Sequence, residues 1–217
     1  MSDILVIAGH PRQDSFSDAL CSAYVDAIGQ RHAVTRINLR ELAFDPILRN
    51  GYQVDQPLEP DLVAAQAQLV AARHVAWFFP MWWNSAPALV RGFVDRVFLP
   101  DFAFRYRKGG LPEKLLRGRS ARVVMTMDSP GWWHWLMNRR AADRAFVRST
   151  LGFVGFAPVH KRVFYGLHGS ADARRQRMLE TVRHDADLDL ARLRKRLGSG
   201  SPAHLHGAQV AHDLAGP

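Results

Sequence analysis

Residues 75–97 read VAWFFPMWWNSAPALVRGFVDRV and hold, in order, the signals of a strand, a turn and a helix. Residues 75–79 are continuously apolar, as in a strand that is buried on both faces of a sheet. Apolar residues then recur at helical spacing over residues 89–97. Ser85 is expected to cap this helix, and Pro87 to lie in its first turn, where a missing N–H costs nothing.

The turn between this strand and this helix carries two adjacent tryptophans, Trp82 and Trp83. In an open α/β sheet, ligands bind at the loops that follow the carboxyl ends of the strands. Indole rings can lie against the faces of a flat ligand there while backbone amides bond to its edge. The alternative interpretation is that both tryptophans are ordinary core aromatics.

Residues 79–98 resemble the FPxxWxxxPAxxKGxxDRVF signature of the flavodoxin-like NAD(P)H:quinone oxidoreductases, with Arg91 where the family usually has lysine. Weaker similarity extends over about residues 3–180. The resemblance implies a flavin site in which the backbone N–H groups of the turn bond the edge of the flavin ring. It assigns the edge contact to the N–H groups of Trp83 and Asn84, and it assigns Pro80, Met81 and Trp82 to the cofactor as well.

The loop after the first predicted strand, residues 4–8, is a second candidate part of this site. It has no GxGxxG fingerprint, but it is similar to the family's HPxxxSFN segment. That similarity implies cofactor contacts from His10, Ser15, Phe16 and Ser17, the last in place of the family's asparagine. Because a helix begins here, its N-terminal amides also favour a phosphate. The alternatives are that Ser15 is a plain N-cap and that His10 bonds only locally.

The third candidate loop follows a predicted strand at residues 121–127 and reads DSPGWWHW. It resembles a branch of the family with an MDxP motif, in which the usual threonine-glycine-glycine turn is missing. The resemblance assigns Asp128, Ser129 and Gly131 to the cofactor and Trp132 to the substrate. His134 is a tentative proton donor; the alternative is a loop histidine that is exposed to water.

A long connection between the central helix and this strand, residues 98–112, contains several aromatic residues. It resembles the family segment that crosses a dimer interface and lines the site of the partner subunit. Tyr106 falls where the family places a tyrosine near the nicotinamide or quinone, so it is a tentative catalytic and substrate-binding residue. The alternative is a surface aromatic that anchors the loop. A homodimer is expected, since single domains seldom expose so many aromatics together.

Composition indicates one α/β domain, because 217 residues with 47% hydrophobic content suffice for one core. We expect five parallel strands in the flavodoxin-like order 2-1-3-4-5, with helices on both faces, over residues 1–197. Residues 198–217 are expected to be a mobile tail, without a metal site although it carries three histidines. Neither a leader nor a membrane span is expected. The single cysteine, Cys21, rules out an intrachain disulfide and favours the cytoplasm.

The net charge of +9 raises the question of nucleic acid, but the basic residues are dispersed, so no nucleic-acid partner is expected. The function that the resemblance implies is an FMN- or FAD-dependent oxidoreductase. It would pass two electrons from NAD(P)H to quinones or similar small acceptors in a ping-pong mechanism. Two alternatives stay open: a non-enzymatic electron carrier, and a regulatory flavoprotein subunit of a transporter.

Overall fold

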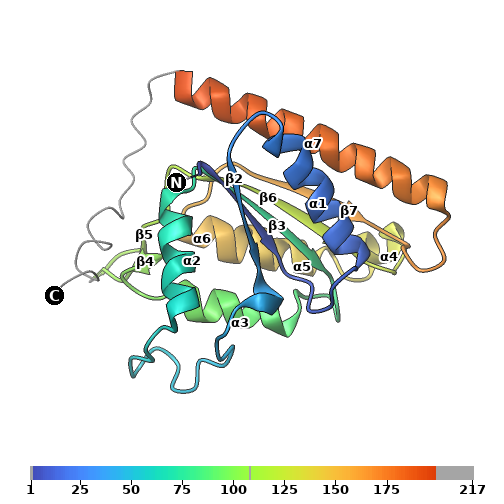
Figure 1. Cartoon of the computed structure of the whole chain (residues 1–217). Helices are drawn as coiled ribbons and strands as arrows, with labels where there is room; N and C mark the ends of the chain where they lie inside the picture. The colour runs from blue at the N-terminus through green and yellow to red at the C-terminus, as the bar shows by residue number, and fades with distance from the viewer. Residues whose placement is uncertain (1, 108, 199–217) are drawn as a thin grey trace.

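The computed structural model describes residues 2–107 and 109–198. They form a five-stranded parallel sheet in the order β2-β1-β3-β6-β7 (Figure 1). The strands are β1 (Ile4–Ala8), β2 (Val34–Asn38), β3 (His74–Pro80), β6 (Ser120–Thr126) and β7 (Val159–Phe164). Counted along this sheet alone, the order is 2-1-3-4-5, which confirms the predicted flavodoxin-like topology.

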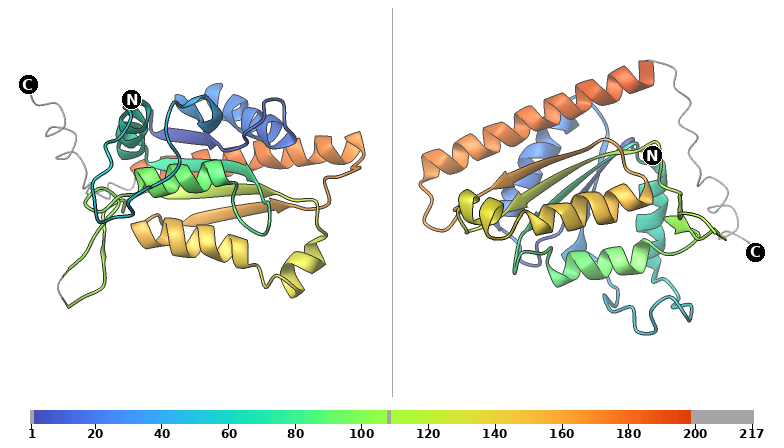
Figure 2. Two further views of the ribbon diagram at one scale, coloured as in Figure 1. Left: turned by 90° about the horizontal axis from the view of Figure 1, so that it is seen from below. Right: turned by 180° about the vertical axis from the view of Figure 1, so that it is seen from behind.

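Helices cover both faces of the sheet (Figure 2). On one face lie α1 (Phe16–Gly29) and α7 (Asp172–Gly198). On the other lie α2 (Pro60–Ala71), α3 (Ala88–Val97), and the consecutive α5 (Ala141–Asp143), η2 (Arg144–Leu151) and α6 (Gly152–Val154). Two short helices, η1 (Leu39–Glu41) and α4 (Gly131–Leu136), lie in connections. Within the described ranges, no helix is both long enough and apolar enough to cross a membrane.

The expected helix cap at Ser85 is wrong. Helix α3 begins at Ala88 with Pro87 in the cap position, and no side chain caps it. Ser85 instead closes a tight turn with Trp82. The predicted mobile tail lies outside the described residues, apart from Gly198, which ends α7.

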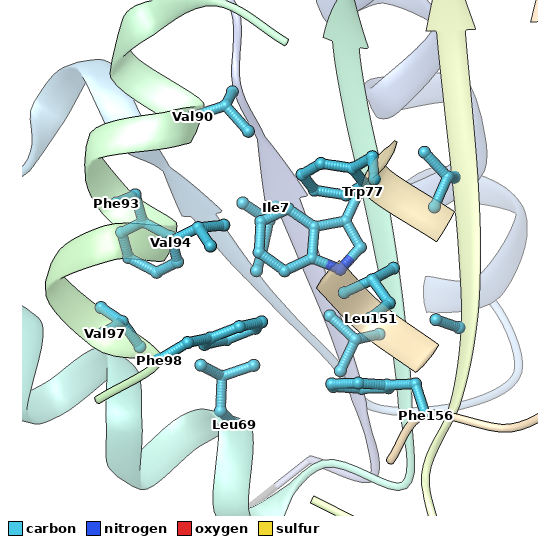
Figure 3. Packing of buried hydrophobic residues seen from close by; sticks show 14 of the residues in the cluster. Ile7, Leu69, Trp77, Val90, Phe93, Val94, Val97, Phe98, Leu151 and Phe156 are labelled. Carbon is cyan, nitrogen blue, oxygen red and sulfur yellow. The ribbon is translucent and has the colours of Figure 1, made fainter. Parts of the chain in front are cut away.

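The larger part of the core lies between the sheet and α3 (Figure 3). Trp77 of β3 is fully buried at its centre, in edge-to-face contact with three rings. The ring centroids are 6.1 Å from Phe93, 6.3 Å from Phe98 and 5.3 Å from Phe146. The structure thus agrees with the sequence interpretation of residues 75–79 as a strand buried on both faces.

Buried charges join the opposite face of the sheet to α7. The Arg122 guanidinium of β6 forms a bidentate pair with Asp189, and its Nη2 donates to Oδ1 at 2.8 Å. The Tyr24 hydroxyl of α1 donates to the same carboxylate at 2.9 Å. His74 of β3 is buried beside them, with its Nε2 3.6 Å from Asp189. One carboxylate of α7 therefore fastens both the sheet and α1.

This cluster makes the stability depend on pH through His74. Burial lowers the pKa of His74 from 6.5 to about 4, although Asp189 opposes that shift. Between these two values the unfolded chain binds more protons than the folded protein, so the stability falls as the pH drops from 6.5 to 4. The expected loss is about 3 kcal/mol.

Urea denaturation at several pH values checks this expectation. The matched variant is His74→Gln, which keeps a polar side chain but does not titrate. It should show a much flatter dependence of the unfolding free energy on pH between 6.5 and 4. An equally steep dependence in the variant would assign the effect to other groups.

Candidate functional site

A pocket of about 220 Å³ lies at the carboxyl edge of the sheet, where the loops after four strands meet. The switch in strand order between β1 and β3 places the opening of a flavodoxin-like ligand site there. The residues that line it are His10, Arg12, Ser15, Phe16, Ser17, Pro80, Met81, Trp82, Thr126, Met127, Asp128 and Leu167. This volume is below the roughly 300–1,000 Å³ of most ligand pockets, so the pocket encloses only part of a nucleotide-sized ligand.

The loop after β1 supplies the polar side of the pocket. Ser15 caps α1, and its Oγ accepts a hydrogen bond from the Asp18 backbone N–H at 3.2 Å. Ser15 and Ser17 are both buried, so their hydroxyls face the pocket rather than bulk water. The amino-terminal end of α1 lies at the same place, and helix N-termini favour anions.

His10 and Arg12 complete this loop. The Arg12 backbone N–H donates to His10 Nδ1 at 2.9 Å. Burial lowers the pKa of His10 below its ordinary value, which favours the neutral ring. Nδ1 also lies 2.9 Å from the Arg12 carbonyl oxygen, so the backbone of Arg12 holds the ring in place. The imidazole also lies edge-on to Trp82, with the ring centroids 5.6 Å apart.

The tryptophan loop is a tight turn with an unusual backbone. Trp82 and Ser85 exchange two backbone hydrogen bonds of 2.9 Å. The two central residues, Trp83 and Asn84, have φ values of 51° and 55°. Positive φ at both central positions is the geometry of a type I′ turn. It is costly for a bulky residue, and such strain concentrates at functional sites.

This turn leaves hydrogen-bonding groups available. In the part of the chain that the structure describes, the backbone N–H groups of Trp83 and Asn84 donate to no backbone carbonyl. The side-chain Oδ1 of Asn84 is buried without a hydrogen-bond partner among the described residues. The indole of Trp83 is completely exposed. The turn thus presents donors, an acceptor and a flat ring beside the pocket.

The pocket contains eight of the twelve predicted cofactor residues. These are His10, Ser15, Phe16, Ser17, Pro80, Met81, Trp82 and Asp128. Trp83 and Asn84 lie next to it on the turn, while Ser129 and Gly131 do not line it. The sequence analysis missed Arg12, Thr126, Met127 and Leu167. Arg12 could have been found, because it is a cation within the candidate phosphate loop.

The prediction that residues 128–135 form a loop is wrong for most of this segment, because residues 131–136 form the helix α4. Packing explains why position 131 is a glycine without any ligand, because a Cβ there would lie 3.3 Å from the Tyr165 ring. Asp128 lies at the pocket and accepts a hydrogen bond from the His168 backbone N–H at 2.9 Å. Trp132 lies on α4 with 62% of its surface exposed and does not line the pocket.

His134 is neither exposed to water nor directed into the pocket. It is completely buried, and its Nε2 lies 2.8 Å from Asp143 Oδ1. Arg140 and Lys161 bind the other oxygen of the same carboxylate. Burial would raise the pKa of Asp143, but hydrogen bonds from Lys161 and His134 hold it below its ordinary value. The geometry makes His134 an anchor of α4.

Tyr106 lies far from the pocket of its own chain. Helix α3 carries the chain back to the amino-terminal edge of the sheet, where β4 (Phe104–Arg105) and β5 (Glu113–Lys114) form a hairpin. Figures 1 and 2 show this hairpin and α4 at opposite ends of the molecule. Tyr106 is mostly exposed and lies edge-on to Phe104. Tyr106 and Trp132 therefore cannot line one site within one chain.

Comparisons with known proteins find the same architecture. A protein-family model described as "Flavodoxin-like fold" matches residues 2–186. The chain is 25% identical to NAD(P)H dehydrogenase [quinone] 1 of Rattus norvegicus, over 86% of this chain and 80% of the rat protein. It is 27% identical to an FMN-dependent NADH:quinone oxidoreductase of Sinorhizobium fredii, over 69% and 68%. The structure of an NAD(P)H:quinone oxidoreductase from Methanothermobacter marburgensis superposes with a TM-score of 0.72 at 20% identity, over 85% and 97%.

Proposed function

The chain belongs to the flavodoxin-like fold family, and from this membership we propose that it is a flavin-dependent NAD(P)H oxidoreductase that reduces quinones or similar small acceptors. The observation that carries the proposal is the meeting of two complementary features at the β1/β3 edge. The amino-terminal end of α1, which favours a phosphate, lies on one side of the pocket. The turn at Trp83 and Asn84, whose backbone N–H groups donate to no backbone carbonyl of the described residues, lies on the other. The names of the rat and rhizobial relatives support the same activity.

The residues present fit a flavin nucleotide. The hydroxyls of Ser15 and Ser17, the first amides of α1 and the Arg12 side chain would bind its phosphate. Because the pocket encloses little more than this end, the ring would lie at the opening, against Trp82. The available groups of Trp83 and Asn84 match the alternating donors and acceptors at the ring edge. The name of the rhizobial relative supports FMN, and FAD stays the alternative.

When bound, the flavin would accept a hydride from NAD(P)H and pass two electrons to the acceptor in a ping-pong sequence. The contribution of the chain is to bind and to orient. Amide donors at Trp83 and Asn84 would stabilise negative charge at the ring edge without reorganising. The indoles beside the opening would hold a flat substrate against the exposed face. No acid or base within the pocket is required by this proposal.

The experiment that tests the function starts from the purified protein. The bound cofactor is released and identified by chromatography, and the oxidation of NADPH and NADH is then followed with a short-chain quinone. The proposal expects a bound flavin and continuous turnover with at least one nucleotide. A flavin that is reduced only by another protein would identify an electron carrier. A protein that binds neither FMN nor FAD would contradict the proposal.

We also propose a symmetric homodimer, for a reason that differs from the sequence argument. Phe104 is buried and Phe102 is half-buried, so only Tyr106 of the expected aromatic cluster is well exposed. Because the hairpin lies opposite the pocket, Tyr106 could reach a pocket only in a second copy of the chain. Light scattering should give twice the chain mass at micromolar concentration. A monomer mass would exclude a role for Tyr106 at the site.

A cytoplasmic location belongs to the same proposal and rests on the state of the single cysteine. Cys21 is buried and forms no disulfide. Burial raises the pKa of its thiol to about 12, so the thiolate is scarce at neutral pH. Cys21 is therefore a packing residue of α1.

A further inference from the structure

Arg175, in the first turn of α7, lies at the rim of the pocket. Its guanidinium carbon is placed over the ring of Phe16, 5.6 Å from the ring centroid. Phe16 lines the pocket and is the first residue of α1, which packs beside α7 on one face of the sheet (Figure 1). Leu167, in the loop just before α7, lines the same pocket. Two segments that are far apart in the sequence therefore meet at the proposed phosphate site.

Topology explains why the beginnings of α1 and α7 lie together. Each helix follows a strand of the parallel sheet, α1 after β1 and α7 after β7, so each begins at the carboxyl edge. Both helices pack on the same face, where their apolar residues share one core cluster. A residue in the first turn of α7 is thus well placed to act on a ligand bound at the start of α1.

The guanidinium of Arg175 is held in place, but most of its donors are unused. Its Nε donates to the Ser170 hydroxyl at 3.0 Å, and the Phe16 ring lies against it. Among the described residues, neither Nη1 nor Nη2 donates to a protein group. Arginine binds phosphate through such paired N–H donors, and a fixed guanidinium loses less entropy when it does so.

The charge of Arg175 is also uncompensated. The side chain is half-buried, yet within the described ranges it forms no ion pair, and Asp172 in the same turn of α7 does not bind it. A partly buried charge is costly unless an opposite charge lies near it. Other arginines near the loop after β1 have that compensation, because Asp18 pairs with both Arg36 and Arg40. The missing counter-charge at Arg175 indicates an anionic ligand.

We propose that Arg175 is a second cationic ligand of the phosphate of FMN, beside Arg12 of the loop after β1. A phosphate at the first turn of α1 would lie next to the Phe16 ring that Arg175 covers. Two arginines match the charge of a terminal phosphate, which is close to −2 at neutral pH. Asp128 is the one carboxylate among the residues that line the pocket, and it accepts from the His168 backbone N–H. The inference rests on the proposed function and extends its phosphate site to the last helix.

Titration of the apoprotein with FMN and with riboflavin tests this inference, because the two ligands differ only in the phosphate. Arg175→Met keeps a long side chain that can pack on Phe16, but it removes the charge and the donors. This variant should bind FMN about tenfold more weakly than the wild type and riboflavin equally well. Arg175→Lys keeps the charge and should recover part of the lost FMN affinity. Thermal melts confirm that each variant is folded.

Arg177→Met is the matched control. It removes the same charge from the same helix, but residues two positions apart face different sides of a helix, and Arg177 is exposed. The control should bind both ligands like the wild type. An equal loss of FMN affinity in the control would assign the effect to the general electrostatic field and overturn the inference.

Two other results with Arg175→Met would also overturn the inference. One is FMN affinity that matches the wild type. The other is an equal loss of riboflavin affinity, which would show that Arg175 only supports the Phe16 ring. The wild type separates these failures from that of the proposed function. If it binds neither FMN nor riboflavin, the proposed function itself is wrong, and if it binds both equally well, the pocket holds no phosphate.

Discussion

Replacing both Ser15 and Ser17 with alanine should lower the affinity for FMN by about 10²–10⁴-fold while the protein stays folded. Each hydrogen bond from a hydroxyl to a charged phosphate contributes about 1.5–3 kcal/mol, so two contribute about 3–6 kcal/mol. Both side chains are buried at the pocket, where water cannot easily replace the lost donors. The Ser15 Oγ also accepts from the Asp18 amide, and the loss of that cap costs about 1 kcal/mol of stability.

Fluorescence titration of the apoprotein with FMN measures this effect, alongside thermal melts. Ser129→Ala is the informative control. The sequence analysis assigns Ser129 to the cofactor, but it does not line the pocket, so this variant should bind FMN like the wild type. If the double variant keeps its affinity in a folded protein, the phosphate lies elsewhere. If Ser129→Ala loses affinity instead, the loop after β6 contacts FMN at Ser129, although this residue does not line the pocket.

The sequence predicts the sheet well because most of its strands are buried on both faces. In a chain of this length, continuous apolar runs such as residues 4–8 and 75–79 indicate strands that are buried in a sheet. The loops after those two strands then meet at one edge by topology alone. For this reason the sequence correctly places Ser15, Ser17 and Trp82 at one pocket.

Predictions from the sequence fail where a segment does not follow the usual relation between local sequence pattern and structure. In α4, a histidine is buried and the tryptophans beside it are exposed, so hydrophobic periodicity points to the wrong face. The type I′ turn at Trp83 and Asn84 lacks the glycine that usually identifies it. Arg122 is a charge within a fully buried strand, and it is tolerated only because Asp189 arrives from α7, 67 residues later.

The resemblance assigns the segment of Tyr106 to the site of a partner subunit, and topology gives a physical reason for that assignment. A helix that follows a parallel strand returns the chain to the amino-terminal edge of the sheet. Residues that follow α3 must therefore lie opposite the pocket. Motif similarity places Tyr106 at a site, and topology decides that this site cannot belong to the same chain.

Replacing Trp77 with alanine should lower the free energy of unfolding by about 3–5 kcal/mol, because a cavity would replace the largest side chain of the core. The indole is completely buried among Phe93, Phe98 and Phe146 (Figure 3). Trp77→Phe should cost much less. It keeps an aromatic ring in this cluster and removes the indole Nε1, which has no hydrogen-bond partner among the described residues.

Trp83→Ala provides the functional contrast within the same stretch of chain. Its side chain is completely exposed, so the loss of stability should stay within about 0.5 kcal/mol. The affinity for FMN should fall by about tenfold through the lost ring contact. Chemical denaturation and FMN titration of both variants separate the two roles: Trp77→Ala should be unstable at any flavin concentration, and Trp83→Ala should be stable but poor in flavin. If Trp83→Ala binds FMN like the wild type, the strained turn holds its indole for some purpose other than the flavin, and only its backbone amides can serve the site.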